Sequence, residues 1–204
     1  MESPIQGDQL VFRNEDITDH VPDKAFVIYD FIWTRIKDWL QEHIQRMIER
    51  IQNKHLYQNY QIKKNSIDTK NGTKSNEKRL FHGTESGITE TINLNGFNRA
   101  YAGSNAALLG KGTYFADEAI YSADDTYSKP DTNGNEYMYL ARVLTGIYCV
   151  GNSEMIAPPA KNPSNPTDLY DSITDNASGP SVFMIFNDVQ AYPEYLITFT
   201  KFIK

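Results

Sequence analysis

The second half of the chain alternates between short apolar runs and polar stretches, which is the pattern of a strand-rich domain. Each run is rich in aromatic and aliphatic side chains and is bounded by turn-forming residues. Helical spacing interrupts the runs at Ile88–Asn95 and Glu118–Tyr127, and Gly96 suits the position after the first of these helices. The expected strands are Arg79–His82, Gly112–Ala116, Glu136–Leu144, Ile147–Val150, Val182–Phe186 and Tyr195–Phe202.

The first part of the chain has a more helical pattern. Leu10–Phe12 reads as a short strand, and apolar residues then recur three and four positions apart over Pro22–Leu40. Ile44–Ile51 is ambiguous, because its periodicity alone would continue a helix. The spacing over Leu56–Ile67 predicts a further helix, which ends in the polar surface loop Asn71–Asn76.

Residues 155–181 contain so many prolines that we expect a long loop without regular structure. Strands joined by few helices predict an α+β fold with largely antiparallel sheets. No Gly-x-Gly-x-x-Gly follows an expected strand, which argues against the dinucleotide-binding unit of dehydrogenases.

The composition is that of one globular domain. A chain of 204 residues with 40% hydrophobic and 23% charged side chains is long enough for a single core. No apolar run approaches the roughly 20 residues of a membrane helix. The start, Met1–Pro4, lacks the basic flank and apolar stretch of a secretion signal, so we expect a cytoplasmic or nuclear domain with no membrane partner.

The polar residues do not indicate a metal or a nucleic acid as ligand. The single cysteine, Cys149, lies in an apolar segment, where we expect a buried, inert thiol rather than a reactive one. The four histidines lack metal-ligand spacing, so we expect no metal. Residues 79–204 hold 8 Lys and Arg against 14 Asp and Glu, the wrong balance for binding nucleic acid. A bound pyrophosphate would rely on backbone N–H groups and on few cations, Arg99 or Lys111.

Two glycine-containing motifs place a histidine and a tyrosine at the ends of expected strands. They are Leu80-Phe81-His82-Gly83-Thr84 and Gly110-Lys111-Gly112-Thr113-Tyr114-Phe115-Ala116, and Ser122 and Tyr127 follow soon after. Glycine in such places lets a backbone or a flat ligand approach closely. Together these residues resemble the nicotinamide pocket of the poly(ADP-ribose) polymerase family, and in particular its mono-ADP-ribosylating branch whose catalytic domain follows macrodomains.

The resemblance covers residues 44–204 and thins out over 1–43, so we expect one catalytic domain with a divergent N-terminal segment. It implies an ADP-ribosyltransferase fold of two packed, largely antiparallel sheets with flanking helices, and a strand rather than a helix over Ile44–Ile51. Further segments that carry the resemblance are Gly96–Arg99, Arg142–Gly146, Pro158–Pro163, Asn165–Leu169 and Gln190–Phe199.

The resemblance also implies the site, with NAD as substrate. Nicotinamide would stack between Tyr114 and Tyr127, while the backbone of Gly83 and the hydroxyl of Ser122 would bind its carboxamide. His82 would hold a hydroxyl of the adenosine ribose. The other residues expected around NAD are Thr84, Gly112 and either Asn98 or Arg99, at the start of a loop over the dinucleotide, Asn98–Leu109.

One position departs from the polymerising members of the family. Where they carry a glutamate that bonds the nicotinamide ribose and polarises an acceptor hydroxyl, this chain has Val182. Because valine cannot activate a hydroxyl, we expect polymer growth to fail, whereas transfer to an Asp or Glu carboxylate, already anionic, survives. Glu194 lies one turn and one strand later, and we interpret it as a surface residue.

The sequence therefore predicts a protein mono-ADP-ribosyltransferase in which His82, Tyr114 and Val182 occupy the catalytic positions. The alternative is a catalytically silent module of the same fold that binds NAD or ADP-ribose. The expected partners are NAD, protein acceptors including the chain itself, and inhibitors that mimic nicotinamide, and we expect a monomer. Few residues precede the first motif, so we expect no regulatory helical bundle and no activation by DNA breaks.

Overall fold

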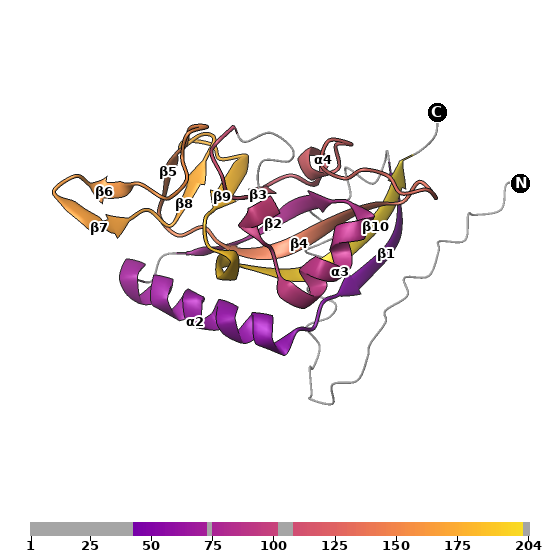
Figure 1. The fold of residues 1–204 in the computed structure, drawn as a ribbon, viewed down its shortest axis with the longest axis horizontal. Helices are drawn as coiled ribbons and strands as arrows, with labels where there is room; N and C mark the ends of the chain where they lie inside the picture. Colours follow the sequence, from indigo (N-terminus) through magenta and orange to yellow (C-terminus); the bar gives the residue numbers. More distant parts are fainter. Residues whose placement is uncertain (1–42, 73–74, 102–107, 202–204) are drawn as a thin grey trace, which may run out of the picture.

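The computed structural model of the chain describes residues 43–72, 75–101 and 108–201. The strand expected at Leu10–Phe12 and the helix expected over Pro22–Leu40 lie outside the described residues. Long strands cross the centre of the molecule, the helix α2 lies along one side of them, and the hairpin of β6 and β7 projects from one end (Figure 1). None of the described helices is long and apolar enough to cross a membrane.

Among the described residues, eight strands form one hydrogen-bonded sheet in the order β1-β10-β4-β2-β3-β9-β8-β5. Neighbours pair antiparallel except β5 and β8, which are parallel. The α+β class with largely antiparallel strands is therefore confirmed. The strands are β1 (His43–Arg50), β2 (Glu77–Thr84), β3 (Thr113–Ala116), β4 (Glu136–Leu144), β5 (Tyr148–Val150), β8 (Ser172–Thr174), β9 (Val182–Ile185) and β10 (Ala191–Lys201).

The sheet is almost divided between β2 and β3. β2 pairs with β4 along its whole length, from Glu77 to Thr84, but it pairs with β3 only where Phe81 faces Ala116. The two sheets that the resemblance implies are thus, in the described residues, one sheet whose halves are joined through a single residue pair. Because backbone groups beyond Phe81 have no partner strand on that side, a cavity can open between the two halves.

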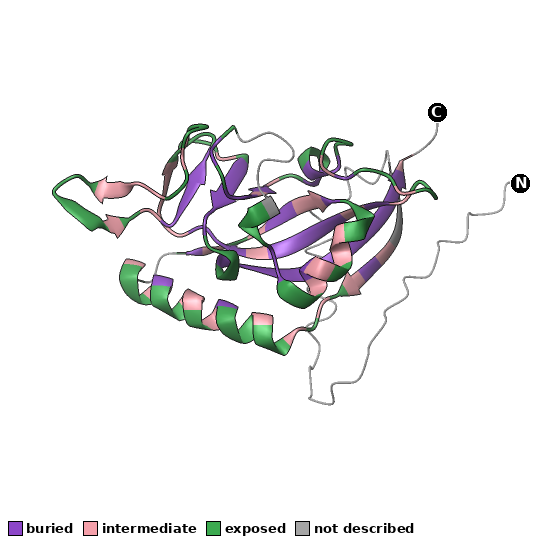
Figure 2. Cartoon of the chain, in the orientation of Figure 1, coloured by how far each residue is buried: buried purple, intermediate pink, exposed green. Residues whose placement is uncertain are grey.

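The segment with ambiguous periodicity is a strand, as the resemblance implied. β1 pairs antiparallel with β10, and Ile48 packs with Ile197 and Phe199 in the core. β10 is buried along Ala191–Thr200, so its outer edge needs a neighbouring strand to pair its backbone groups. Tertiary pairing therefore decides the conformation of β1 against its helical spacing. Figure 2 shows buried residues concentrated along these central strands.

Helix α2 (Lys54–Asn71) confirms the prediction from its spacing. The side chain of Asn53 accepts a hydrogen bond from the backbone N–H of Leu56 (3.1 Å) and so caps the helix. Tyr60 and Ile67 are its buried residues and pack with Leu144 of the sheet. The opposite face of α2 is exposed (Figure 2).

The two later helices are α3 (Ser86–Asn95) and α4 (Ala119–Ser122). Gly96 ends α3 with a φ of 78°, as its position predicted. α4 is shorter than the expected Glu118–Tyr127, because polar side chains after Ser122 bond the backbone in turns instead. The Asp124 carboxylate accepts from the N–H of Thr126 (2.9 Å), and Oγ of Ser128 lies 2.8 Å from the Ser122 carbonyl oxygen.

Residues 155–181 do not form one irregular loop, and that prediction is wrong. They contain β8 and a separate antiparallel hairpin of β6 (Ala160–Asn162) and β7 (Asn165–Leu169). Pro163 lies in the turn of this hairpin, and Pro166 lies in a strand that has a partner on one side only. Proline lacks an N–H donor, and such edge positions do not require one.

The reading of Glu194 as a surface residue is also wrong. Its side chain on β10 is 5% exposed and accepts hydrogen bonds from Arg79 Nε (2.7 Å) on β2 and Arg142 Nε (2.8 Å) on β4. Burial alone would raise the pKa of this carboxyl, but the two arginines hold it below its usual value. Glu194 therefore joins three strands and lies in the framework of the fold.

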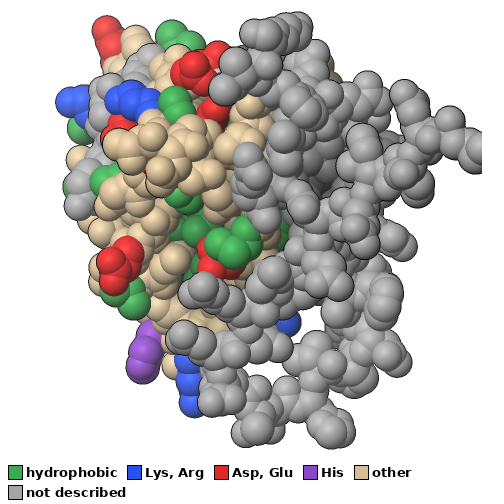
Figure 3. Space-filling view, turned by 90° about the vertical axis from the view of Figure 1, so that its right-hand side faces the viewer, with side chains coloured by type: hydrophobic (Ala, Val, Ile, Leu, Met, Phe, Trp, Pro, Cys, Tyr) green, Lys and Arg blue, Asp and Glu red, His purple; other side chains and the backbone are tan. Residues whose placement is uncertain are grey.

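Other charged groups pair locally, as Lys201 does with Asp125 and Glu136. Figure 3 shows acidic and basic side chains interspersed where described residues form that face. Cys149 is half-buried against the cluster around Ile173, and burial raises the pKa of its thiol. Within the described ranges, no group of three or more His, Cys, Asp and Glu side chains could hold a metal ion.

Candidate active site

A cavity of about 500 Å³ opens where β2 and β3 part. Its walls are the end of β2, α3 with the turn after it, β3, the segment 121–127 and the start of β9. A volume of this size is typical of small-molecule and cofactor sites. The cavity brings together most of the predicted site residues: His82, Gly83, Thr84, Asn98, Gly112, Tyr114, Ser122, Tyr127 and Val182.

His82 is held in one tautomer. Its Nδ1 lies 2.7 Å from the backbone carbonyl oxygen of Tyr114, and since a carbonyl can only accept, Nδ1 carries the hydrogen. The ring packs edge-on against Phe97, with centroids 5.0 Å apart. Desolvation lowers the pKa of His82, partly offset by this hydrogen bond, so the ring is neutral at pH 7. Nε2 is then an acceptor for a ligand hydroxyl.

Position 83 needs a glycine because the segment that contains Ser122 and Tyr127 passes very close to it. A Cβ added there would lie 2.2 Å from the Ser122 carbonyl oxygen and 2.8 Å from Cβ of Tyr127. The absence of a side chain thus lets the strand that carries His82 lie directly against the segment that carries Ser122 and Tyr127. Gly83 therefore places three predicted site residues on one wall.

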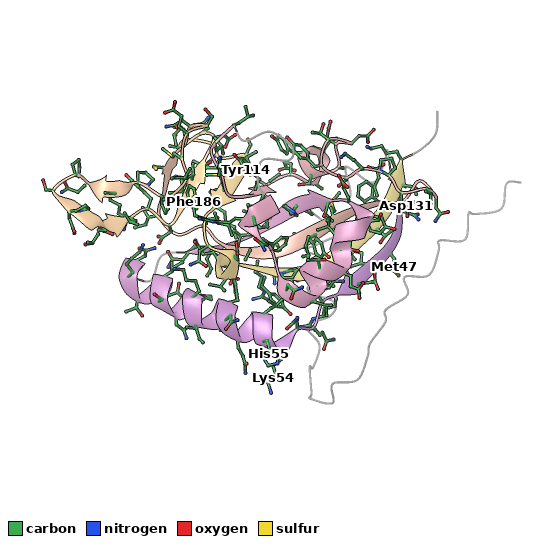
Figure 4. All side chains as sticks on the ribbon, viewed as in Figure 1. Met47, Lys54, His55, Tyr114, Asp131 and Phe186 are labelled. Carbon is green, nitrogen blue, oxygen red and sulfur yellow. The ribbon has the colours of Figure 1, made fainter. Side chains whose placement is uncertain are left out.

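Tyr114 is fixed at both ends of its side chain. It lies on β3, and its hydroxyl donates to the carbonyl of Gly110 (2.7 Å) while accepting from the N–H of Leu109 (2.9 Å). Burial raises the pKa of the hydroxyl, which therefore stays protonated. The ring, which is labelled in Figure 4, lines the cavity and is held in one orientation by its hydroxyl, as stacking on a flat ligand requires.

Tyr127 has an aromatic neighbour that the sequence did not indicate. Its ring stacks on Tyr121 with centroids 5.4 Å apart and an interplanar angle of 18°, and the two hydroxyls lie 3.2 Å apart. This hydrogen bond, aided by burial, raises the pKa of Tyr121 to about 12. Tyr121 also lines the cavity, so Tyr127 reaches it as one member of a stacked pair.

The start of β9 carries Val182, which is buried, faces Ala116 of β3 in register and lines the cavity. A carboxylate nevertheless lies close to Val182. Asp175, which the sequence analysis also missed, lines the same cavity and accepts a hydrogen bond from the N–H of Val182 (3.0 Å). No local pattern indicates this pair, because a turn brings residues 175 and 182 together.

Of the two candidates in the loop after Gly96, only Asn98 lines the cavity. The guanidinium of Arg99 donates instead to the carbonyl of Phe186 (3.1 Å), and its N–H donates to Asp188 (3.0 Å). Lys111, the other expected cation, is not among the lining residues either. Half of the expected loop Asn98–Leu109, residues 102–107, lies outside the described residues.

The comparisons with known proteins agree with this geometry. Residues 41–201 match the model of the poly(ADP-ribose) polymerase catalytic domain. Human protein mono-ADP-ribosyltransferase PARP14 is 62% identical over 154 residues, which are 76% of this chain and 9% of that protein. Human protein mono-ADP-ribosyltransferase PARP12 is 39% identical over 173 residues, covering 84% of this chain and 24% of that protein.

Mouse protein mono-ADP-ribosyltransferase PARP11 is 38% identical over 174 residues, covering 76% of this chain and 52% of that protein. The chain thus spans between about a tenth and half of the length of these relatives. A family match over most of the chain, together with high identity, is decisive. The chain belongs to the family of poly(ADP-ribose) polymerase catalytic domains.

Proposed function

We propose that this domain is an NAD-dependent protein mono-ADP-ribosyltransferase. The observation that carries the proposal is one cavity that holds a neutral, oriented His82, a rigid Tyr114, and Val182 where a hydroxyl-activating glutamate would stand. The names of the relatives, all protein mono-ADP-ribosyltransferases, support the same activity. Because NAD is intracellular, we expect the domain to act in the cytoplasm or nucleus. We also expect it to act as a monomer.

In this proposal the nicotinamide end of NAD lies against Tyr114 and Tyr127, with its carboxamide on the backbone of Gly83 and the hydroxyl of Ser122. Nε2 of His82 accepts a hydroxyl of the adenosine ribose and fixes the other end of the substrate. Ring stacking contributes about 0.5–1.5 kcal/mol per pair beyond burial. These contacts hold the glycosidic bond in one place while it breaks.

The reaction transfers one sugar unit to a protein side chain. The bond between C1′ of the ribose and the nicotinamide nitrogen breaks, its electron pair goes to the ring nitrogen, and neutral nicotinamide leaves. An Asp or Glu carboxylate of the acceptor forms the new bond to C1′, so no proton has to be removed. A sugar hydroxyl would need a base, which Val182 cannot supply, and the product therefore stays a single unit.

The first test is incubation with labelled NAD followed by a denaturing gel, comparing wild type with Tyr114→Ala and Val182→Glu. We expect a discrete labelled band in the wild type that hydroxylamine removes, and its loss in Tyr114→Ala. A ladder in the wild type would contradict the reading of Val182.

The second candidate is a silent binding module of the same fold, which the valine at position 182 favours. No label in the wild type, together with thermal stabilisation by a nicotinamide analogue, would establish that candidate. Wild-type analogue affinity in Tyr114→Ala would mean that the analogue does not stack on Tyr114, and the proposed placement of nicotinamide would fail for both candidates.

A further inference from the structure

We propose that Asp175 is a catalytic residue of this site, and that its carboxylate supplies the negative charge beside the reacting ribose that Val182 cannot supply. The inference rests on the proposed function, because it concerns the same cavity and the same bond. It assigns a chemical role to a residue that no sequence motif singled out.

The turn between β8 and β9 holds the carboxylate in place. Oδ1 of Asp175 accepts from the backbone N–H groups of Ser181 and Val182, each at 3.0 Å. The N–H of Asp175 donates in turn to the Val182 carbonyl (3.3 Å). Asp175 is therefore fixed to the backbone of the position where the polymerising members carry their glutamate.

The carboxylate is ionised and keeps one oxygen for a ligand. Partial desolvation opposes ionisation, but the two backbone N–H groups and the hydroxyl of Thr174, whose Oγ1 lies 3.1 Å from Oδ1, outweigh it and lower the pKa of Asp175. In the described part of the chain, no side chain or backbone group donates to Oδ2 and no Lys or Arg forms an ion pair with Asp175. The negative charge is therefore not neutralised by these residues.

Asp175 is exposed to solvent, but it also lines the cavity, together with Val182, Tyr114 and Tyr121. The field of Asp175 contributes, after the Tyr127 hydrogen bond and burial, to the raised pKa of Tyr121. A fixed negative charge at this wall is near the place where nicotinamide would leave.

The chemistry needs such a charge. As the bond from C1′ to nicotinamide breaks, its electrons move to the ring nitrogen and C1′ becomes positively charged. Asp175 stabilises that charge by Coulomb attraction and is unchanged when the acceptor carboxylate bonds to C1′. No proton is transferred, so the residue accelerates departure of nicotinamide without activating a hydroxyl.

If Asp175 only closed the turn, replacing it by asparagine would have a different effect from the one expected for a catalytic charge. Closing the turn requires only an acceptor oxygen, which an asparagine side chain also provides, whereas stabilising C1′ requires the charge. Asp131 is a matched control, because its Oδ1 also accepts from two backbone N–H groups, of Asn133 (2.8 Å) and Asn135 (2.9 Å). Asp131 lies far from Tyr114 and does not line the cavity (Figure 4).

The experiment compares wild type, Asp175→Asn and Asp131→Asn by nicotinamide release with a protein acceptor, by affinity for a nicotinamide analogue, and by melting temperature. Removing one preorganised charge from a site typically lowers the rate by a large factor. Because Asp175 is exposed, solvent weakens its field and makes this factor smaller, so we expect kcat of Asp175→Asn to fall about tenfold. KM and analogue affinity should match wild type. The melting temperature should fall slightly and by a similar amount in both variants, because each carboxylate accepts hydrogen bonds that lower its pKa, and Asp131→Asn should keep the wild-type kcat.

A wild-type kcat in Asp175→Asn would overturn the inference while leaving the proposed function intact. Loss of analogue affinity in parallel with kcat, or a melting temperature well below that of Asp131→Asn, would also overturn it, because the residue would then only close the turn. A wild type that releases no nicotinamide would overturn the proposed function itself, and this inference with it.

Discussion

A Cβ atom on Gly83 would collide with backbone rather than with a flexible side chain, since its nearest neighbour is the Ser122 carbonyl oxygen at 2.2 Å. Relief would require the segment carrying Ser122 and Tyr127 to move out of the cavity wall. Such overpacking costs about 1–3 kcal/mol. We therefore expect Gly83→Ala to lower the melting temperature and to weaken nicotinamide-analogue binding about tenfold or more, as measured by thermal unfolding and calorimetry.

Gly87 provides the matched control for this substitution. It lies in α3, and a Cβ added there would meet nothing within 4 Å. Gly87→Ala should stabilise the domain by about 0.5–1 kcal/mol through helix propensity and leave analogue binding unchanged. If Gly83→Ala bound the analogue as tightly as Gly87→Ala does, the close approach of the two segments would be irrelevant to the pocket.

At the scale of the elements, the ion pairs of Glu194 with Arg79 and Arg142 join β10 to β2 and β4, and their effect on stability can be tested. Glu194→Gln keeps the shape of the side chain but leaves Arg79 and Arg142 facing a neutral amide in a largely buried setting. Removing one partner of a buried pair typically costs about 3–5 kcal/mol, and the partial exposure of both arginines puts the expected loss near 3 kcal/mol in urea unfolding.

The control for Glu194→Gln is Asp168→Asn in β7. Asp168 pairs with Lys161 across the projecting hairpin, and its side chain is 42% exposed. An exposed pair contributes about 0–1 kcal/mol, so this variant should unfold close to wild type. Equal stability of the two variants would mean that Glu194 does not hold the three strands together.

The difference between buried and exposed strands also explains which strands could be predicted from the sequence. β4 matches its predicted bounds, because a strand buried on both faces reads as a continuous apolar run. β6 and β7 were missed, since an exposed hairpin has no apolar pattern and contains prolines. In the site, motif residues such as Tyr114 were predictable, whereas Tyr121 and Asp175 depend on a ring stack and a turn that no local pattern encodes.

At the scale of the whole molecule, the cavity lies where the described strands pair least. β10 and β4 are buried almost throughout, β2 is buried only at Leu80, Phe81 and Thr84, and the junction of β2 and β3 is a single residue pair. A ligand therefore enters where strand pairing is weakest, but against a wall that the core keeps rigid. Parts of the molecule that extend beyond this core should be dispensable for binding.

The hairpin of β6 and β7 is such a part, since it projects from the end of the molecule and its residues are half-buried or exposed (Figures 1 and 2). Replacing residues 161–168 by a short Gly-Ser linker keeps the closing pair of Ala160 and Leu169. Surface changes usually alter stability by about 0.5 kcal/mol or less, so melting temperature and analogue affinity should stay near wild type. Ile173→Ala, in the adjoining fully buried β8, should instead lower the free energy of unfolding by about 2–5 kcal/mol.

If the linker variant lost analogue binding, the hairpin would have to be counted as part of the site. Loss of transfer to a protein acceptor alone would mean that the hairpin selects the substrate.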